Sequence, residues 1–213
     1  TGHEAAAHGG DVTSLVLVPT IASAVSIPVI AAGGFADGRG LAAALALGAE
    51  GIAMGTRFMT TKESPLHDSF KKLSIEKDVY DTLYSDRFDG LGCRVLDTEP
   101  ARKAIRMGLN IPKLVEAFFN SRDVAKQMHL PFIKLFIGVL MMGWENAKQL
   151  AFMANAFKAI RVATENGDLQ QGVLPVGQIT GLLKDIPTVA DLMERMTKEA
   201  EEVQNRLSGI MQA

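Results

Sequence analysis

The chain has 213 residues, of which 47% are hydrophobic and 22% charged, and its formal net charge is −2. This composition is that of a globular protein long enough to bury a sizeable core in one or two domains, and it offers no electrostatic attraction for nucleic acid or an anionic membrane. Cys93 is the only cysteine, which excludes a disulfide within the chain and fits a reducing compartment, so we expect a cytoplasmic protein.

Residues 1–62 alternate helical and strand patterns. TSLVLVPTIASAV (13–25) predicts a helix with Pro19 in its first turn, because an interior proline would break the helix. SIPVIAAGG (26–34) follows as a short apolar run that ends on glycines, which predicts a buried strand.

A helix and a second strand come next. ADGRGLAAALALGAE (36–50) predicts a helix that Asp37 caps and Gly48 terminates. EGIAMGTRF (50–58) predicts the next strand. A strand, a helix and a strand in this order form a β-α-β unit, which is typical of a parallel sheet in an α/β protein.

The rest of the chain divides into two further zones. Residues 63–116 are more polar and predict extended or mixed connecting structure around a turn at residues 89–92. Residues 117–213 predict mostly helical structure, with a closing amphipathic helix over 188–211. Its apolar stripe predicts core packing and consists of Leu192, Met196, Ala200, Val203 and Leu207. The apolar segment 130–144 is too short and too interrupted to span a membrane.

Both predicted strands of the first zone end on glycine, one αβ unit apart. Gly33 and Gly34 end the first strand, and Gly55 and Thr56 end the second. Glycine lets the main chain approach a ligand, and the amides of such loops, and of a helix that follows, are donors for a phosphate. In (β/α)8 barrels, phosphate sites frequently use the loops after strands 7 and 8. We therefore interpret the four residues as a phosphate cup; tight turns without a ligand are the alternative.

Three segments together resemble one family: GHEAAAHGG (2–10), IPVIAAGGFADGRGLAAALALGAEGIAMGTRF (27–58) and GQITGLLKDIPTVADLM (177–193). They look like the nitronate monooxygenases, formerly called 2-nitropropane dioxygenases, a family that also includes FMN-dependent enoyl-acyl-carrier-protein reductases. The resemblance implies an FMN-binding TIM (β/α)8 barrel with an added, mostly helical domain over its mouth. Such a barrel needs about 250 residues and eight strands, so we expect the C-terminal part of a barrel whose N-terminal strands are missing here.

The resemblance also implies roles for individual residues. The loop GHEAAAHGG would lie near the flavin ring, and His8 matches the catalytic histidine of the family. Ala6 and Ala7 depart from the family pattern, which has two glycines there. His3 lies five residues before His8, so in an extended loop the two would face opposite sides. The implied contacts of the FMN phosphate are Ala32, Gly33, Gly34, Gly55 and Thr56.

Other polar residues receive modest predictions. Arg57 either neutralises phosphate charge or forms an ion pair behind the strand. Cys93 is interpreted as an inert small residue, and His67 and His129 as solvated loop residues without a catalytic role. Glu4 and Gln178 are given no role. No cluster has metal-ligand spacing, and GGFADG lacks the glycine register of a dinucleotide fingerprint.

The function implied by the resemblance is FMN-dependent oxidation of an alkyl nitronate by O2 to a carbonyl compound and nitrite. His8 would stabilise the nitronate or remove the α-proton of a nitroalkane. The Met- and Phe-rich segment 128–157 would roof an apolar substrate pocket. Two alternatives stay open: an NAD(P)H-dependent flavin reductase acting on an enoyl thioester or a quinone, and an inactive fragment.

Overall fold

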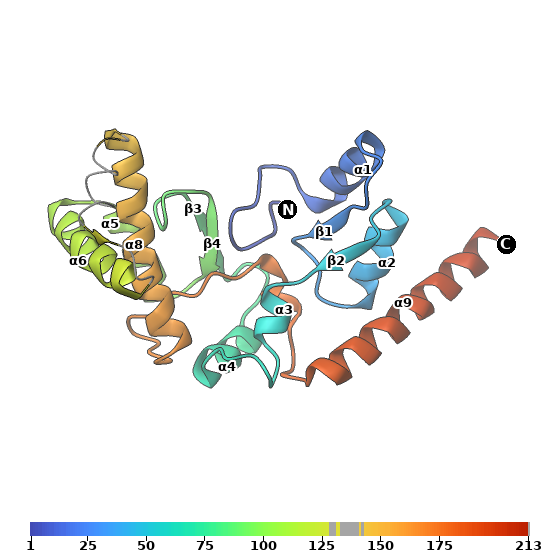
Figure 1. Ribbon diagram of the computed structural model, residues 1–213. Coiled ribbons are helices and arrows are strands. Elements are labelled where there is room, and N and C mark those ends of the chain that lie inside the picture. The colour runs from blue at the N-terminus through green and yellow to red at the C-terminus, as the bar shows by residue number, and fades with distance from the viewer. Residues whose placement is uncertain (128–130, 133–140, 142, 213) are drawn as a thin grey trace.

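A computed structural model describes residues 1–127, 131–132, 141 and 143–212 (Figure 1). Residues 128–130, 133–140 and 142 of the expected roof, and with them His129, lie outside the described residues. The helices and strands are α1 (Ser14–Ala24), β1 (Ile30–Ala32), α2 (Gly38–Ala46), β2 (Gly51–Ala53), α3 (Thr56–Met59), α4 (Asp68–Glu76), β3 (Thr82–Ser85), β4 (Cys93–Leu96), α5 (Glu99–Met107), α6 (Ile111–Gln127), α8 (Trp144–Thr164), a 3-10 turn (Gln178–Leu182) and α9 (Val189–Met211).

The predicted β-α-β unit is confirmed. β1 and β2 pair in parallel, with Ala31 opposite Ile52, and α2 connects them. The α/β class follows, but within the described residues the parallel sheet has two strands and does not close into a barrel. The expectation that this chain is the C-terminal part of a TIM barrel, with the N-terminal strands missing, therefore stays a prediction. The hairpin of β3 and β4 is antiparallel and confirms the turn predicted between them.

The strand predicted to be buried is covered on one face only. Ala31 is 3% exposed and packs with Val18 and Ala44. Its neighbour Ile30 points to the opposite face, because side chains alternate along a strand, and is 58% exposed. The expectation of a fully buried strand is therefore wrong for β1.

The ends of α2 are confirmed at the residues that the sequence indicated. The Asp37 side chain accepts hydrogen bonds from the amides of Arg39 and Gly40. At the other end Gly48 has φ +90°, and Ala49 donates its amide to the Ala44 carbonyl, which is the Schellman arrangement. Because Asp37 and Gly48 act on their immediate neighbours, both ends were readable from sequence.

The position of Pro19 differs from the prediction. Pro19 lies inside α1, five residues after its start, rather than in the first turn. A proline there has no amide to donate to the carbonyl of Leu15. Leu15 is 70% exposed, so water can reach this part of the helix and the lost bond is not buried.

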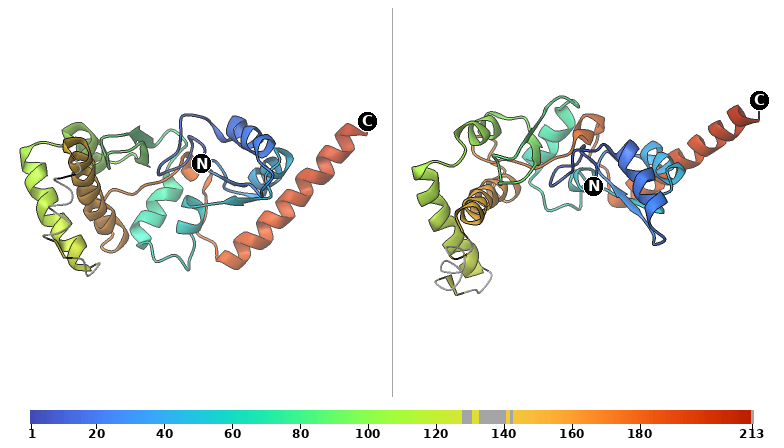
Figure 2. Two further views of the ribbon diagram at one scale, coloured as in Figure 1. Left: turned by 45° about the horizontal axis from the view of Figure 1, so that its top comes forward. Right: turned by 90° about the horizontal axis from the view of Figure 1, so that it is seen from above.

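The long helices α6, α8 and α9 lie at the two ends of an elongated molecule (Figures 1 and 2). α6 and α8 pack together at one end, and α9 packs on α2 at the other. The predicted apolar stripe of α9 is buried only near its start, at Leu192 and Met196, whereas Leu207 is 43% exposed. The reason is length, because α9 has 23 residues and α2 has nine. The division into zones at 62 and 116 stays a prediction.

The contact of α2 with α9 generates a stability prediction. A Cβ at Gly38 would lie 2.3 Å from the carbonyl oxygen of Met196, which belongs to the backbone of α9 and cannot move cheaply. Gly38→Ala should therefore lower the free energy of unfolding by about 1–3 kcal/mol. Urea denaturation followed by circular dichroism measures this.

Gly40→Ala is the matched control, because Gly40 lies on the same helix but its Cβ would not meet α9. The nearest atom to that Cβ is Cδ1 of the Phe35 ring, at 3.3 Å. Alanine is favoured over glycine inside a helix by up to about 1 kcal/mol, so this variant should be as stable as the unchanged protein or slightly more so. Equal unfolding midpoints for the two variants would contradict the packing of α9 on α2.

Candidate active site

A pocket of about 340 Å³ lies at the carboxyl ends of β1 and β2. Its volume is within the range of small-molecule sites, about 300–1,000 Å³. The structure brings all the residues expected to contact the FMN phosphate into the lining of this one pocket. They are Ala32, Gly33, Gly34, Gly55 and Thr56.

The first wall of the pocket needs glycine for backbone reasons. Gly33 and Gly34 have φ values of +91° and +84°, a region that residues with a Cβ rarely adopt. A Cβ on Gly33 would also lie 3.0 Å from the Gly2 carbonyl oxygen and 3.1 Å from the Cβ of Ala5. This turn therefore lets the chain of the N-terminal loop pass close beside the end of β1.

Gly55, in the second wall, is under no such backbone constraint. Its φ of −80° is ordinary for any residue, and a Cβ built there has no atom within 4 Å. Because Gly55 lines the pocket, a methyl group would extend into space that a ligand would use. The backbone alone thus does not explain this glycine.

The main-chain donors of the pocket come from the loops. In the described part of the chain, the amides of Gly34 and Gly55 donate to no protein acceptor. The expectation that α2 adds its own N-terminal amides is wrong, because carboxylates already bind them. Glu199 accepts from Gly38, and the Asp37 cap accepts from the next two amides.

Thr56 has a structural partner as well as a place in the pocket. Its buried hydroxyl accepts a hydrogen bond of 2.9 Å from the amide of Gly177. The hydroxyl hydrogen is left to donate, so the expected role of Thr56 as a donor fits this geometry. Gly177 also lines the pocket, so this hydrogen bond joins two parts of the lining that lie far apart in the sequence.

The N-terminal loop forms the remaining wall. Ala5, Ala6 and Ala7 line the pocket with their small side chains. Glu4 lines it too, but both of its carboxylate oxygens lie 3.1 Å from the Ser14 amide, at the start of α1. Since the Thr13 side chain makes no capping bond, Glu4 caps this helix from ten residues away. This gives a structural role to a residue that sequence reasoning left unassigned.

His8 lies beside the pocket rather than in its lining. Its Nε2 is 2.8 Å from Oδ2 of Asp89, and its side chain is 44% exposed. A carboxylate only accepts, so Nε2 carries the proton in the neutral imidazole, and Nδ1 is left as the acceptor. His3 instead bonds the Gly10 carbonyl and packs against Tyr84.

Asp89 is the residue of this site that the sequence did not reveal. It lies 81 residues from His8, in the turn between β3 and β4, and its side chain is 13% exposed. Its Oδ1 accepts from the Leu91 amide, which fixes the carboxylate. Cys93, the first residue of β4, is buried, and this burial, followed by the nearby Asp89 charge, raises the pKa of its thiol to about 12. Cys93 is thus protonated at neutral pH, in keeping with an inert residue.

The remaining candidates have structural partners. Arg57 is 3% exposed and forms an ion pair with Asp185, so the ion-pair alternative holds for it. Burial lowers the pKa of Arg57, partly offset by Asp185. His67 caps α4, because its side chain accepts a hydrogen bond from the main-chain amide of Ser69. The main-chain amide of Gln178 donates a hydrogen bond to the Glu4 carbonyl. Within the described ranges, no group of three or more His, Cys, Asp or Glu residues is placed to hold a metal ion.

The family model described as nitronate monooxygenase matches residues 1–199. The chain belongs to the nitronate monooxygenase family. This confirms the resemblance carried by the three sequence segments. No helix in the part of the chain that the structure describes has the length and hydropathy to cross a bilayer.

Three proteins illustrate the breadth of the similarity. The (3aS,4S,5R,7aS)-5-hydroxy-7a-methyl-1-oxo-octahydro-1H-indene-4-carboxyl-CoA dehydrogenase of Rhodococcus jostii RHA1 is 39% identical over an alignment of 202 residues that covers 93% of this chain and 57% of that relative. A probable nitronate monooxygenase of Staphylococcus haemolyticus JCSC1435 is 37% identical over an alignment of 122 residues that covers 52% of this chain and 34% of the relative. The structure of FabK from Thermotoga maritima is 35% identical, with a TM-score of 0.74 over 98% of this chain and 55% of that one. The chain thus spans little more than half the length of this dehydrogenase and of this FabK.

The contact between His8 and Asp89 generates a spectroscopic prediction. In Asp89→Asn, the main-chain amide of Leu91 should donate its hydrogen bond to the side-chain oxygen of the new asparagine. The asparagine NH2 group then faces Nε2 of His8. Nε2 must then accept, and the imidazole proton moves to Nδ1. The ¹⁵N chemical shifts of the His8 ring should exchange their order accordingly.

Asp86→Asn is the control for that measurement. Asp86 lies in the same turn and is exposed, so the variant removes the same charge without touching His8. The ring shifts of His8 should be those of the unchanged protein. Unaltered shifts in Asp89→Asn would show that the carboxylate does not set the tautomer.

Proposed function

We propose that this protein is an FMN-dependent oxidoreductase whose cofactor phosphate binds at the carboxyl ends of β1 and β2. The observation that carries the proposal is the convergence of Gly33, Gly34, Gly55 and Thr56 on one pocket, from two loops that are one αβ unit apart. Family membership supports the choice of a flavin.

The residues present fit a phosphate group bound mainly by the main chain. The Gly34 and Gly55 amides are open donors, and the Thr56 hydroxyl hydrogen is a third. Gly55 has no Cβ and leaves the approach clear. Ala5, Ala6 and Ala7 form a wall of small apolar side chains, against which an isoalloxazine ring can lie. When bound, FMN supplies electron transfer to and from the substrate.

His8 would serve as the proton-transfer residue. Its hydrogen bond to Asp89 keeps the proton on Nε2 and leaves Nδ1 free to take a proton from a substrate carbon. The loop that carries His8 also carries Ala7, which lines the pocket. A substrate lying over the open side of the pocket would therefore meet both the cofactor and the imidazole.

The substrate class that we propose first is a coenzyme A thioester. The similarity to the Rhodococcus jostii dehydrogenase, whose name includes a carboxyl-CoA substrate, extends over 93% of this chain. A hydrogen on the carbon next to a thioester carbonyl is acidified by that carbonyl, so a base such as His8 can remove it. The sequence analysis raised reduction of an enoyl thioester as an alternative. The reaction proposed here acts on the same class of substrate but is a dehydrogenation.

Oxidation of an alkyl nitronate is the second candidate. The family model and the Staphylococcus haemolyticus relative support it, although that relative matches 52% of the chain. The carbon beside a nitro group is acidified in the same way, and oxygen would complete the oxidation to a carbonyl compound and nitrite. Mixing the flavin-loaded protein anaerobically with an acyl-CoA, a nitronate or NADH separates the candidates, because the true electron donor bleaches the flavin absorbance.

The main-chain phosphate site predicts a specific effect of one methyl group. Gly55→Ala should weaken FMN binding by about 1–3 kcal/mol, since the added Cβ would crowd the ligand, while the φ of −80° leaves the fold unstrained. Flavin fluorescence titration measures the affinity, and thermal unfolding checks the fold.

Gly10→Ala is the matched variant for that titration. A Cβ there also has no atom within 4 Å, but Gly10 does not line the pocket. FMN should bind this variant as it binds the unchanged protein. The phosphate site would be misplaced if both variants bound FMN equally well.

The assignment of His8 predicts a loss confined to turnover. His8→Ala should reduce the rate of flavin reduction by the substrate by about 10²- to 10⁴-fold, the usual contribution of a general base, with FMN affinity retained. Stopped-flow absorbance measures both. His3→Ala, a change of the same residue type in the same loop, should leave the rate within a few-fold; a larger loss in His3→Ala than in His8→Ala would transfer the role to His3.

A further inference from the structure

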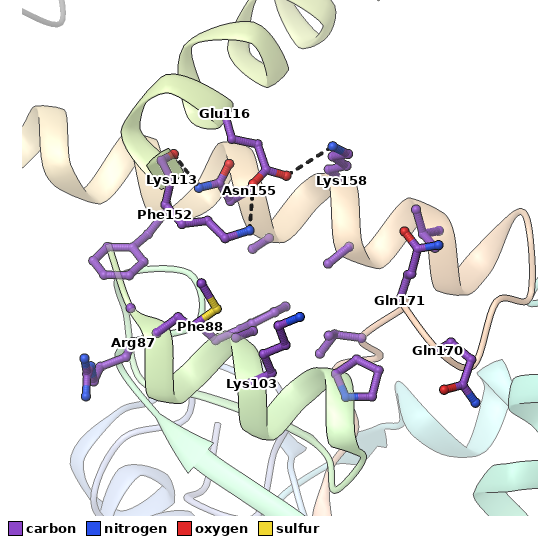
Figure 3. Close-up of a pocket in the computed structure, with 18 residues that line it drawn as sticks. Arg87, Phe88, Lys103, Lys113, Glu116, Phe152, Asn155, Lys158, Gln170 and Gln171 are labelled. Carbon is purple, nitrogen blue, oxygen red and sulfur yellow. Dashed lines mark hydrogen bonds and ion pairs between the residues drawn. The ribbon is translucent and has the colours of Figure 1, made fainter. Parts of the chain in front are cut away.

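A second pocket, of about 260 Å³, lies among α5, α6 and α8, away from the ends of β1 and β2 (Figure 3). Its lining comes from the turn before β4, from these three helices and from the loop after α8. None of its residues lines the pocket of the proposed cofactor. The mechanism proposed above gives it no role.

The charge of this pocket is its first notable property. Four cationic residues line it, Arg87, Lys103, Lys113 and Lys158, against one carboxylate, Glu116. Glu116 is already neutralised, because its two oxygens lie 2.7 Å from the Lys113 ammonium and 3.1 Å from that of Lys158. The whole chain has a net charge of −2, so this local excess of positive charge favours an anionic ligand.

Lys103 is a cation available to such a ligand. It lies on α5, and its side chain has no ion-pair or hydrogen-bond partner among the residues that the structure describes. In Figure 3 its ammonium group projects into the space between α5 and α8. A phosphate entering the pocket would therefore find a charged donor that no protein group already uses.

The rest of the lining is suited to a flat apolar ring with polar edges. Phe88 is 4% exposed and lies in the pocket wall, with Phe152 from α8 also in the lining. Two amide side chains, Gln170 and Gln171, lie on the opposite side of the space in Figure 3. Glutamine side chains offer both a donor and an acceptor to the edge of a base.

We propose that this pocket binds the phosphorylated adenosine end of a coenzyme A thioester. The inference rests on the proposed function, since it identifies the thiol carrier of that substrate. A nucleotide phosphate matches the excess positive charge, and an adenine ring matches the aromatic wall with its amide side chains. An acyl-carrier-protein thioester has no adenosine, so the pocket favours coenzyme A as the carrier.

The turn between β3 and β4 places this pocket next to the chemistry. Phe88 lines the pocket, and the next residue, Asp89, bonds His8. The pantetheine arm of coenzyme A joins the nucleotide to the thioester, so one substrate can occupy both sides of this turn. The nucleotide would then anchor the substrate while its acyl group reaches His8.

Titration with adenosine 3′,5′-bisphosphate, the nucleotide fragment of coenzyme A, tests the proposal without flavin and without turnover. Isothermal calorimetry on the full chain should detect binding that weakens as salt is added. Lys103→Glu should weaken that binding by about tenfold or more, and Lys103→Arg should retain it. Lys198→Glu is the matched control: this lysine lies on α9 with glutamates four residues to either side, and it does not line the pocket.

Several outcomes would overturn the proposal. They are no binding at millimolar bisphosphate, an equal effect of Lys103→Glu and Lys198→Glu, and inorganic phosphate binding as tightly as the bisphosphate. The last would indicate a simple anion site. Failure of the FMN titration alone would refute the proposed function but not this pocket, whereas failure of the bisphosphate titration with FMN still bound would refute only the pocket's assignment.

Discussion

The N-terminal loop is hydrogen-bonded through its main chain to three separate parts of the molecule, and the site depends on these bonds. Gly2 donates to the Ala32 carbonyl at the end of β1. The Ala6 carbonyl accepts from Arg94 of β4, and the Glu4 carbonyl accepts from Gln178. A loop with few bulky side chains has little hydrophobic burial to hold it in place, so these main-chain bonds, which the surrounding strands orient, determine where it lies.

This construction explains why the proposed cofactor pocket is built from such small residues. Gly33 and Gly34 allow the N-terminal loop to lie close to the end of β1, and Ala5, Ala6 and Ala7 line the pocket with small side chains. Main-chain donors are positioned by the fold itself and lose no side-chain entropy when they bind a ligand. The second pocket differs in this respect, since three of its four cations are long lysine side chains on helices. In the proposed assignments, the pocket built from main-chain donors holds the cofactor, and the pocket built from long side chains binds the nucleotide of the substrate.

Family membership and substrate choice depend on different residues. The residues that bind a cofactor phosphate are shared by enzymes that act on different substrates, so a match over residues 1–199 identifies the family without selecting the reaction. In the proposed assignment, the features that would separate a thioester from a nitronate lie in the turn of Asp89 and among α5, α6 and α8. These are the regions where sequence patterns were least informative.

The sequence by itself determined the elements whose signals are local. Asp37 and Gly48 mark the ends of α2 because a cap acts on the next few amides, and the glycine-ended strands mark a β-α-β unit because the carboxyl ends of parallel strands meet at one edge. Only the tertiary structure decided what depends on distant partners. Examples are the contact of Asp89 with His8 across 81 residues, the capping of α1 by Glu4 and the carboxylates that already bind the amides of α2. A side chain's partner across such a separation is set by the packing of whole elements, which no short window of sequence encodes.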